Sequence, residues 1–327
     1  MIPLLLAAAV VADIQNLTFG VTSSEARGNA VEQVRQAARR MSKNLVSVTA
    51  FVLAGEDLNA VRSALDAQVV RRGRPVVAVV GVGGLAEPGA KVVLEHVSVG
   101  RAHNLHGIAF VAGQPASSEK PAEVAPLVEK SLADLRKAHA AAAVDGADVL
   151  RVTCYMSSLA DINAARRLTE KEFPNAARNY VQLVRSADRG FVECETVVRL
   201  RSAPGEALKL VQPEGLSRSP NYSHVAMLGP GKVVFSGGHY AAGIQDSDAR
   251  ALFTSLDKAL AAEGSGLRHV AMSSLYPTST AAAELIRRIR FDFYDRTRPP
   301  ASTMLVFESL PDAAPFAAHV VAFVSRR

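Results

Sequence analysis

Val46-Ser-Val-Thr-Ala-Phe-Val-Leu-Ala-Gly-Glu-Asp-Leu-Asn-Ala-Val-Arg62 has a second copy 104 residues further along the chain, Leu150-Arg-Val-Thr-Cys-Tyr-Met-Ser-Ser-Leu-Ala-Asp-Ile-Asn-Ala-Ala-Arg166. Both copies read Val-Thr near their start and Asp-x-Asn-Ala-x-Arg at their end. The same offset continues without a gap to the pairs Arg74/Arg178 and Val77/Val181. A register kept over this length indicates an internal repeat of one structural unit.

A third and more diverged copy follows, because Met272-Ser-Ser-Leu275 matches Met156-Ser-Ser-Leu159. The segment 202–215 is rich in Pro and Gly, so we expect it to link the second copy to the third. The predicted units are 13–99, 100–205 and 206–327.

Each unit is predicted to contain two helices and several strands. The spacing of apolar residues predicts one amphipathic helix per unit, at 30–41, 124–143 and 247–262. A second helix in each unit is expected to begin near an N-capping residue, Asp57, Asp161 and Thr280. Gly146 and Gly264 stand where helix C-caps are expected, and 75–82 and 92–99 are expected strands.

This order of elements predicts an α+β fold in which two helices cover one face of a mixed sheet. The other face of each sheet needs a cover as well. Three units in one chain can cover one another, sheet against sheet, as a body with pseudo-threefold symmetry.

The composition is that of a folded protein with two or three domains. The chain has 327 residues, of which 49% are hydrophobic and 21% charged, which excludes disordered, collagen-like and coiled-coil chains. Two cysteines are too few for a disulfide framework, so Cys154 and Cys194 are expected to be small core residues. The net charge of +6 is compatible with anionic ligands but selects none.

The first twelve residues, Met1-Ile-Pro-Leu-Leu-Leu-Ala-Ala-Ala-Val-Val-Ala12, resemble the apolar part of a signal peptide. We therefore predict a signal peptide at 1–12 and a periplasmic or secreted protein. The alternative is a buried N-terminal strand in a cytoplasmic protein, since no Lys or Arg precedes the apolar run. No apolar run reaches the roughly 20 residues that span a bilayer, so no membrane partner is expected.

The second unit contains three short motifs in a fixed order, Ile108-Ala-Phe-Val-Ala-Gly-Gln114, Phe173-Pro-Asn-Ala-Ala-Arg178 and Phe191-Val-Glu-Cys-Glu195. They resemble the Ser-Gly-Gln strand, the approach to the substrate arginine and the final Glu-x-Glu strand of the Rid family (YjgF/YER057c/UK114). This family of imine deaminases is also described under the heading endoribonuclease L-PSP. Arg178 and Glu193 lie 15 residues apart, which is the family's spacing.

The third unit resembles the same family through Pro220-Asn-Tyr-Ser-His224 and Lys232-Val-Val-Phe-Ser-Gly-Gly238. Members of the family are homotrimers with clefts between adjacent subunits. The resemblance therefore implies three units of the bacillar chorismate mutase-like fold joined in one chain. Such a chain would be an intramolecular pseudotrimer and a monomer.

The resemblance implies hydrolysis of 2-imino or enamine acids to 2-keto acids and ammonia, without a cofactor or a metal. Arg178 would hold the substrate carboxylate, because a planar guanidinium matches two carboxylate oxygens. Glu193 would orient and deprotonate a water molecule. Gly113 and Tyr180 would line the same pocket. Without the family spacing, Arg178 and Glu193 would be interpreted as a cross-strand ion pair.

The first unit departs from this pattern. It keeps Arg74 and Glu95, but Val93 replaces the first glutamate. Arg74 could therefore bind a carboxylate without activating water.

The third unit departs further, with Ser302 at the arginine position and Ala317 and His319 at the two glutamate positions. Arg298 is near enough in sequence to substitute for the missing arginine. We expect one competent site at most, formed by the second unit, with Tyr222 and Ser236 of the third unit added across a cleft.

Two other functions stay open: a non-catalytic binder of small carboxylates, and a ribonuclease or interaction scaffold. Nucleic acid is an unlikely partner, because the basic cluster Arg287-Arg288-Ile-Arg290 is typical of a solvated helix face. The eight histidines show no metal-ligand spacing, and His103 and His106 are expected at the surface.

Overall fold

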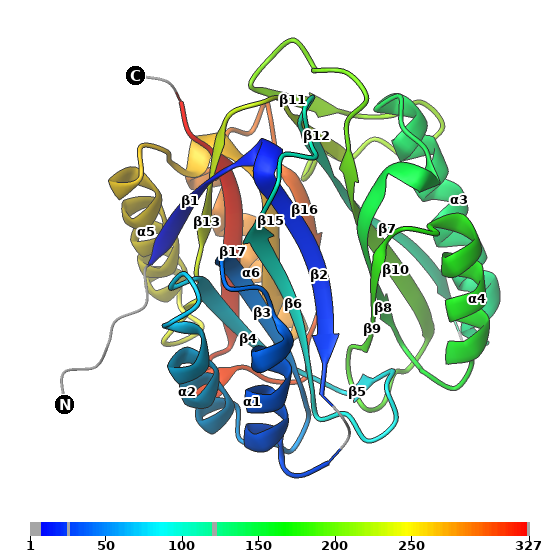
Figure 1. Ribbon diagram of the computed structural model, residues 1–327, viewed down its shortest axis with the longest axis vertical. Coiled ribbons are helices and arrows are strands. Elements are labelled where there is room, and N and C mark those ends of the chain that lie inside the picture. The colour runs from blue at the N-terminus through cyan, green and yellow to red at the C-terminus, as the bar shows by residue number, and fades with distance from the viewer. Residues whose placement is uncertain (1–7, 25–26, 120–122, 326–327) are drawn as a thin grey trace.

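Three β-sheets lie in the middle of the molecule, and pairs of helices cover their outer faces (Figure 1). The structure is a computed structural model that describes residues 8–24, 27–119 and 123–325. Six α-helices occur within these described residues, and none of them is long and apolar enough to cross a membrane. The architecture is therefore α+β with several sheets, as the order of elements predicts.

The first sheet has four strands, in the order β2 (Leu17–Ser23), β6 (Val92–Val99), β3 (Leu45–Leu53) and β4 (Val76–Val82). It is covered by α1 (Ala30–Arg40) and α2 (Leu58–Val69). The Asp57 carboxylate accepts hydrogen bonds from the amides of Asn59 and Ala60, as expected of an N-cap. The predicted strands at 75–82 and 92–99 are confirmed.

The second sheet has seven strands, in the order β11 (Leu208–Val211), β12 (Val225–Leu228), β7 (Ile108–Ser118), β10 (Gly190–Arg199), β8 (Val149–Met156), β9 (Ala177–Gln182) and β5 (Gly84–Leu85). It is covered by α3 (Val124–Ala141) and α4 (Ile162–Glu172). Gly146 does not end α3, because the helix stops at Ala141 and Gly146 begins a short 3₁₀ turn. Asp161 precedes α4, but its carboxylate accepts from the Val124 amide of the neighbouring helix instead.

The third sheet contains β1 (Ala9–Asp13), β13 (Lys232–Ser236), β17 (Phe316–Phe323), β15 (Val270–Pro277) and β16 (Ala301–Met304), with β14 (His239–Tyr240) also paired to β17. It is covered by α5 (Asp246–Ala262) and α6 (Thr280–Ile289). Ser279, one residue before the predicted Thr280, caps α6 by accepting from the Ala282 amide. Gly264 follows α5 with a positive φ of 78°, as a C-cap glycine does.

The three sheets share one strand register. A parallel pair joins β3 to β4, β8 to β9 and β15 to β16, and its matching rungs are Val48/Val77, Val152/Arg178 and Ser273/Ser302. An antiparallel pair joins the same first strand to the last strand of each repeat, with matching rungs Thr49/Glu95, Thr153/Glu195 and Ser274/His319. The register therefore places Ser302 at the arginine position and His319 at the second glutamate position, as the sequence predicts.

The same register corrects the prediction for Arg74. Val77, and not Arg74, occupies the position of Arg178, because the first copy is three residues longer between the two paired strands. The extra residues belong to the turn before β4, where Arg74 is exposed with a φ of 52°. Arg74 therefore has no place in a cleft equivalent to that of Arg178.

Neighbouring repeats exchange strands. β5 lies between β4 and β6 of the first sheet in sequence but pairs with β9, and β12 precedes β13 of the third sheet but pairs with β7. The segment 202–215 is accordingly not only a linker, since it includes β11.

The N-terminal segment takes part in this exchange. Ala9–Asp13 forms β1, which pairs with β13 in the third sheet. Residues 1–7 lie outside the described residues, and cleavage after Ala12 stays a prediction; it would remove all of β1 except Asp13.

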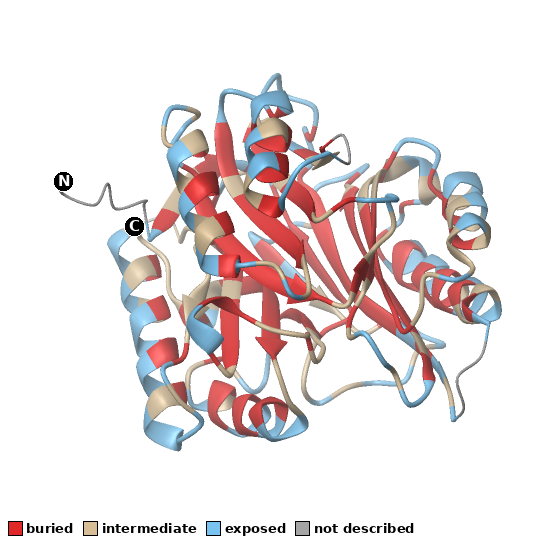
Figure 2. Ribbon diagram, turned by 90° about the horizontal axis from the view of Figure 1, so that it is seen from below, coloured by how far each residue is buried: buried red, intermediate tan, exposed pale blue. Residues whose placement is uncertain are grey.

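The inner faces of the sheets form a shared core. Figure 2 shows the buried strands at the centre and the exposed outer faces of the helices. The equivalent side chains Phe51, Tyr155 and Tyr276 meet there, and Phe307 packs edge-on against the two tyrosines at centroid distances of 5.8 and 5.0 Å. Sheet against sheet, the three layers bury aromatic and aliphatic side chains that none could bury alone.

Candidate functional site

Two cavities lie where neighbouring sheets meet, and each combines the arginine position of one sheet with the first-glutamate position of the next. In the first cavity Arg178 of the second sheet meets Val93 of the first. In the second cavity Ser302 of the third sheet meets Glu193 of the second. We refer to these as the Arg178 cavity and the Glu193 cavity.

The Glu193 cavity has a volume of about 180 Å³. Its lining consists of Gly113, Pro115, Glu193, Asn221, Tyr222, Arg287, Arg290, Ser302 and Met304. Three of the residues predicted from the sequence, Glu193, Gly113 and Tyr222, therefore lie together here.

Glu193 is buried, with 8% of its surface exposed, and its carboxyl lies directly over Gly113. A Cβ atom at Gly113 would stand only 2.0 Å from Oε1 of Glu193, so a side chain there would displace the carboxyl from its present position. Burial, and secondarily the nearby Glu195, raises the pKa of Glu193 to about 8. The carboxyl is thus a group that exchanges a proton near neutral pH, which suits a general base or acid.

Strand β10, which carries Glu193, is linked next to this residue to strand β8 and to helix α3. The next residue, Cys194, forms a disulfide with Cys154 on β8, and its amide donates to Oγ of Ser131 at 3.1 Å. Both cysteines are buried core residues, as expected, but the sequence did not predict the bond between them. The cysteines are 40 residues apart in sequence, but the antiparallel register places them directly opposite each other.

A buried arginine faces the same cavity from the third sheet's helix layer. Arg290 is only 2% exposed and forms no salt bridge with any described residue. Its Nη2 donates to the Asn221 carbonyl at 2.9 Å, its Nη1 donates to Ser302 Oγ at 3.3 Å, and its Nε has no partner among the described residues. Burial lowers the pKa of Arg290 to about 10, so the side chain stays cationic at neutral pH. A carboxylate ligand would supply the missing counter-charge.

The position of Arg290 explains how it replaces the strand arginine. It follows α6 and continues the helix face formed by the buried Leu285, Ile286 and Ile289, so it points inward. The interpretation of this basic cluster as a wholly solvated face is therefore wrong for Arg290. The helical spacing of four from Ile286 to Arg290 was the signal in the sequence that places it on the buried side.

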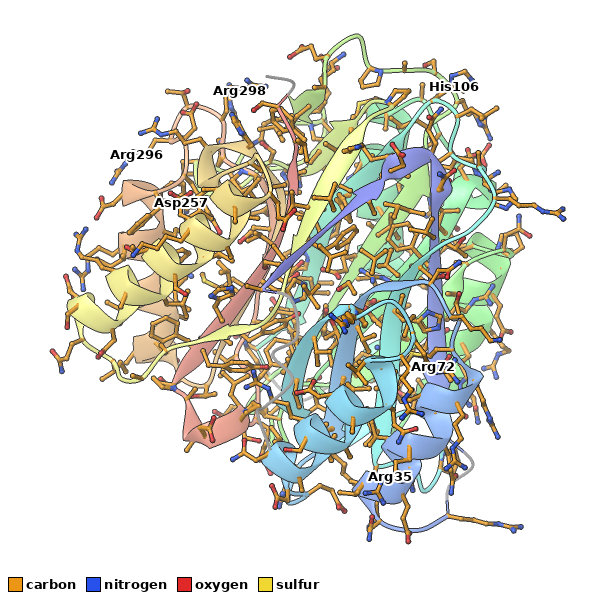
Figure 3. All side chains as sticks on the ribbon, turned by 60° about the vertical axis from the view of Figure 1, so that its left-hand side comes forward. Arg35, Arg72, His106, Asp257, Arg296 and Arg298 are labelled. Carbon is orange, nitrogen blue, oxygen red and sulfur yellow. A yellow bond between two sulfur atoms is a disulfide. The ribbon has the colours of Figure 1, made fainter. Side chains whose placement is uncertain are left out.

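Arg298, the substitute expected from the sequence, does not line the Glu193 cavity. Its side chain is 55% exposed and its Nη2 donates to the carbonyl of Leu208 at 2.9 Å. Figure 3 shows Arg298 and Arg296 at the outside of the molecule.

Tyr222 borders Glu193 in the same cavity. Burial first, and the Glu193 carboxyl second, raise the pKa of Tyr222, so its hydroxyl remains protonated and can donate a hydrogen bond. Its backbone carbonyl accepts from Gln212 Nε2 at 2.7 Å, and its ring packs edge-on against His224 at 5.1 Å. These contacts fix the segment that closes the cavity.

The Arg178 cavity, of about 200 Å³, has a guanidinium, and the acid in its lining is Glu87, which pairs with Arg166 at 2.7 Å. Arg178 Nη2 donates to the carbonyl of Phe173, and its Nε has no partner among the described residues. The predicted Tyr180 also lines this cavity, with its hydroxyl bonded to that of Thr169. Val93 occupies the position that Glu193 occupies in the other cavity, so this cavity offers charge recognition without a proton acceptor at that position.

Arg178 and Glu193 therefore do not form one site. Strand β8 lies between their strands, and Arg178 pairs with Val152 whereas Glu193 pairs with Tyr155. Two strand spacings and three residues along the strand separate their backbones by about 14 Å. Although they are 15 residues apart in sequence, Arg178 lines one cavity and Glu193 lines the other.

The third contact, between the third sheet and the first, is bridged by a tyrosine. Tyr240 stands at the register position of Pro115, and its hydroxyl donates to the Val79 carbonyl at 3.1 Å and accepts from the Val79 amide at 2.8 Å. The predicted Ser236 lies in β13, where its hydroxyl donates to the Gly237 carbonyl and accepts from the Val320 amide. Ser236 thus has a structural partner set and lines neither cavity.

No group of three metal-ligating side chains occurs within the described ranges of the chain. His103 and His106 are exposed, as predicted, and Figure 3 shows His106 at the outer surface.

No protein-family model matches the sequence, and a search of curated proteins found no match. Solved structures do match, each over about a third of this chain. A member of the YjgF/YER057c/UK114 family from Mycobacterium tuberculosis is 18% identical over 28% of this chain and 79% of its own, with a TM-score of 0.26. A YjgF-family protein from Neisseria meningitidis is 16% identical over 37% of this chain and 97% of its own, with a TM-score of 0.28. These matches include the family that the sequence motifs resemble.

Proposed function

We propose that the chain joins three Rid-like units and hydrolyses 2-imino or enamine acids to 2-keto acids and ammonia in the Glu193 cavity. The observation that supports it most is the meeting of a buried carboxyl, Glu193, with a buried guanidinium that lacks a carboxylate partner, Arg290. The common register of the three sheets supports the threefold fusion. Because the three sheets cover one another within one chain, we also propose that it acts as a monomer.

Substrate binding follows from the charges in the cavity. The substrate carboxylate pairs with Arg290, which has a free Nε and no acidic partner among the described residues. This pairing orients C2 of the imino acid toward Glu193, and Tyr222 can donate a hydrogen bond beside it.

Hydrolysis then proceeds in two steps. Ionised Glu193 takes a proton from a water molecule as the water oxygen bonds to C2, and passes this proton to the imine nitrogen to give a carbinolamine. In the second step Glu193 takes the proton of the C2 hydroxyl and passes it to the amine nitrogen, the C–N bond breaks with its electron pair on nitrogen, and ammonia leaves as the carbonyl of the 2-keto acid forms. No electrons are exchanged with the protein, so the chemistry requires no redox cofactor.

A second function is favoured by the Arg178 cavity. Its arginine faces Val93, so we propose that it binds small carboxylates without hydrolysing them. This is the non-catalytic alternative, confined to one of the two cavities.

The Cys154–Cys194 disulfide provides an argument about the cellular location of the protein. Disulfides persist in oxidising compartments, so the Cys154–Cys194 bond supports a periplasmic or secreted location. This location remains a proposal, as does the signal peptide.

Two arginine variants test the assignment. Ammonia release from 2-iminobutanoate, generated in the assay by an amino acid oxidase, should fall by about 10- to 100-fold in kcat/KM for Arg290→Ala, because a charge-assisted hydrogen bond to the carboxylate is lost. Arg178→Ala should stay within about twofold of wild type, since Val93 stands in its cavity at the position that Glu193 has in the other. Full activity of Arg290→Ala, or loss of activity in Arg178→Ala alone, would move the reaction out of the Glu193 cavity.

A further inference from the structure

A second arginine lines the Glu193 cavity. Arg287 lies three residues before Arg290 at the end of α6, so the two side chains are neighbours on one helix face. Arg287 is 43% exposed and pairs with Glu284 on its own helix, whereas Arg290 is buried. The cavity thus has one guanidinium in its interior and another where it meets solvent.

When the Glu193 carboxyl is protonated, as most of it is at pH 7 with a pKa of about 8, the two arginines give the cavity more positive charge than a monocarboxylate neutralises. A single carboxylate neutralises the buried Arg290 and leaves Arg287 with only the exposed Glu284 as partner. A second carboxylate on the same ligand could replace solvent around Arg287.

Between the two charges the lining is suited to a short carbon chain. Pro115 and Met304 offer apolar surface, and Asn221 and Ser302 offer polar groups. The volume of about 180 Å³ lies below the 300–1,000 Å³ typical of ligand pockets, so the cavity suits a small molecule.

We propose that the preferred substrates of the Glu193 cavity are 2-imino dicarboxylic acids of four or five carbons. Arg290 binds the carboxylate beside the imine carbon and Arg287 binds the distal carboxylate. This inference rests on the proposed hydrolysis for its kinetic part, whereas the ligand class itself rests only on the two arginines.

The test compares dicarboxylic and monocarboxylic ligands in two assays. Hydrolysis is measured with 2-iminoglutarate and 2-iminobutanoate, each generated by an amino acid oxidase. Binding of the stable products 2-oxoglutarate and 2-oxobutanoate is measured by calorimetry on the same protein. We expect wild type to favour the dicarboxylate in both assays by about tenfold. Arg287→Ala should remove this preference by raising KM and Kd for the dicarboxylate alone.

Arg288→Ala is the matched control. Arg288 is 60% exposed on the same helix, pairs with Asp246, and is not among the residues that line the Glu193 cavity. It should retain the preference, and Arg287→Lys should restore part of it.

The outcomes separate the two proposals. Hydrolysis of both imines with equal efficiency, or an equal effect of Arg287→Ala and Arg288→Ala, would overturn the dicarboxylate assignment and leave the hydrolase intact. Absence of hydrolysis with selective, Arg287-dependent binding of 2-oxoglutarate would overturn the hydrolase and retain the ligand class.

Discussion

At the scale of single residues, the candidate site depends on a carboxyl and a guanidinium that come from different sheets. Glu193 takes its place from the strand register and from the glycine beneath it, whereas Arg290 takes its place from the inward face of a helix. Both side chains are buried, so their electrostatic interactions with other charged groups in the cavity are stronger than they would be in water.

The proton of Glu193 should control the pH dependence of hydrolysis. Only the ionised carboxyl accepts a proton from water, and burial raises its pKa to about 8, so kcat/KM should rise with pH and level off above about 8. Glu193→Gln should lower kcat by about 10²- to 10⁴-fold and abolish this rise. The measurement is ammonia release from pH 6 to 9, corrected for spontaneous hydrolysis without protein. A flat wild-type profile, or an active Glu193→Gln, would exclude Glu193 as the base.

The residues of the site were partly accessible to sequence reasoning. Motif order and spacing located Glu193, Gly113 and Tyr222, because these residues belong to the short motifs within the repeats. The same motifs wrongly placed Arg178 in the site of Glu193, because spacing within one unit does not show which neighbouring sheet a side chain faces. Arg290 lies in a helix, so a strand motif could not find it, although helical periodicity could.

At the scale of elements, most helices and strands follow from local patterns. The helices at 30–41, 124–143 and 247–262 and the Asp57 cap agree with α1, α3, α5 and the start of α2. Arg74 was wrongly aligned with Arg178 because the turn before β4 is three residues longer than its counterpart in the second unit, and turns show no periodic pattern that reveals such an insertion. The disulfide also escaped prediction, since pairing two cysteines requires the register of β8 against β10.

The cross-strand disulfide should stabilise the second sheet. Closing a loop of about 40 residues in the unfolded chain contributes about 2–4 kcal/mol in the chain-entropy model. The double variant Cys154→Ala/Cys194→Ala should therefore unfold at a lower urea concentration by this free energy.

Thiol titration provides the control for this prediction. Wild type unfolded without reductant should show no free thiols, and reductant should not shift the urea midpoint of the double variant. Two free thiols in the unfolded wild type would contradict the bond.

At the scale of the whole molecule, a buried polar network joins the three sheets at their centre. Arg151 of the second sheet pairs with Glu95 of the first at 3.1 Å, and lies 3.8 Å from Glu195. Thr303 of the third sheet donates to Glu195, and Asn179 donates to Glu95 at 2.8 Å. The network satisfies charges that would otherwise be buried without partners.

Removing the shared cation should destabilise the whole assembly. Arg151→Met should lower the free energy of unfolding by about 3–5 kcal/mol at pH 8, because two buried carboxylates lose their partner. The loss should be smaller at pH 5, since burial already raises the pKa of Glu195 to about 7 and a protonated carboxyl needs no cation. Urea unfolding at both pH values measures the two losses.

Arg136→Met is the surface control, because the Arg136–Glu172 pair has a half-exposed arginine. It should cost less than about 1 kcal/mol at either pH. Equal losses for the two variants would show that the central network contributes no more than a surface pair.

The sheet-against-sheet arrangement followed from the repeats, but its asymmetry did not. Val93, Glu193 and Ala317 occupy one register position, so the three contacts differ in chemistry while sharing a backbone. Tyr240 joins the third sheet to the first through its two bonds to Val79. Such a contact depends on the side chains that two different sheets bring to their interface, so the pattern within a single repeat could not predict it.

The pairing of β1 with β13 has a consequence for the newly synthesised chain. The partner strand β13 is synthesised more than 200 residues after β1. At the usual 5–20 residues per second, the ribosome needs roughly 10–45 s to supply that partner. The first sheet contains only strands from 17–99, so all of its strands are available during that interval. Ala9–Asp13 remains unpaired with β13 until that strand is synthesised. In a chain that keeps residues 9–13, the pairing of β1 with β13 can therefore form only after β13 has been translated.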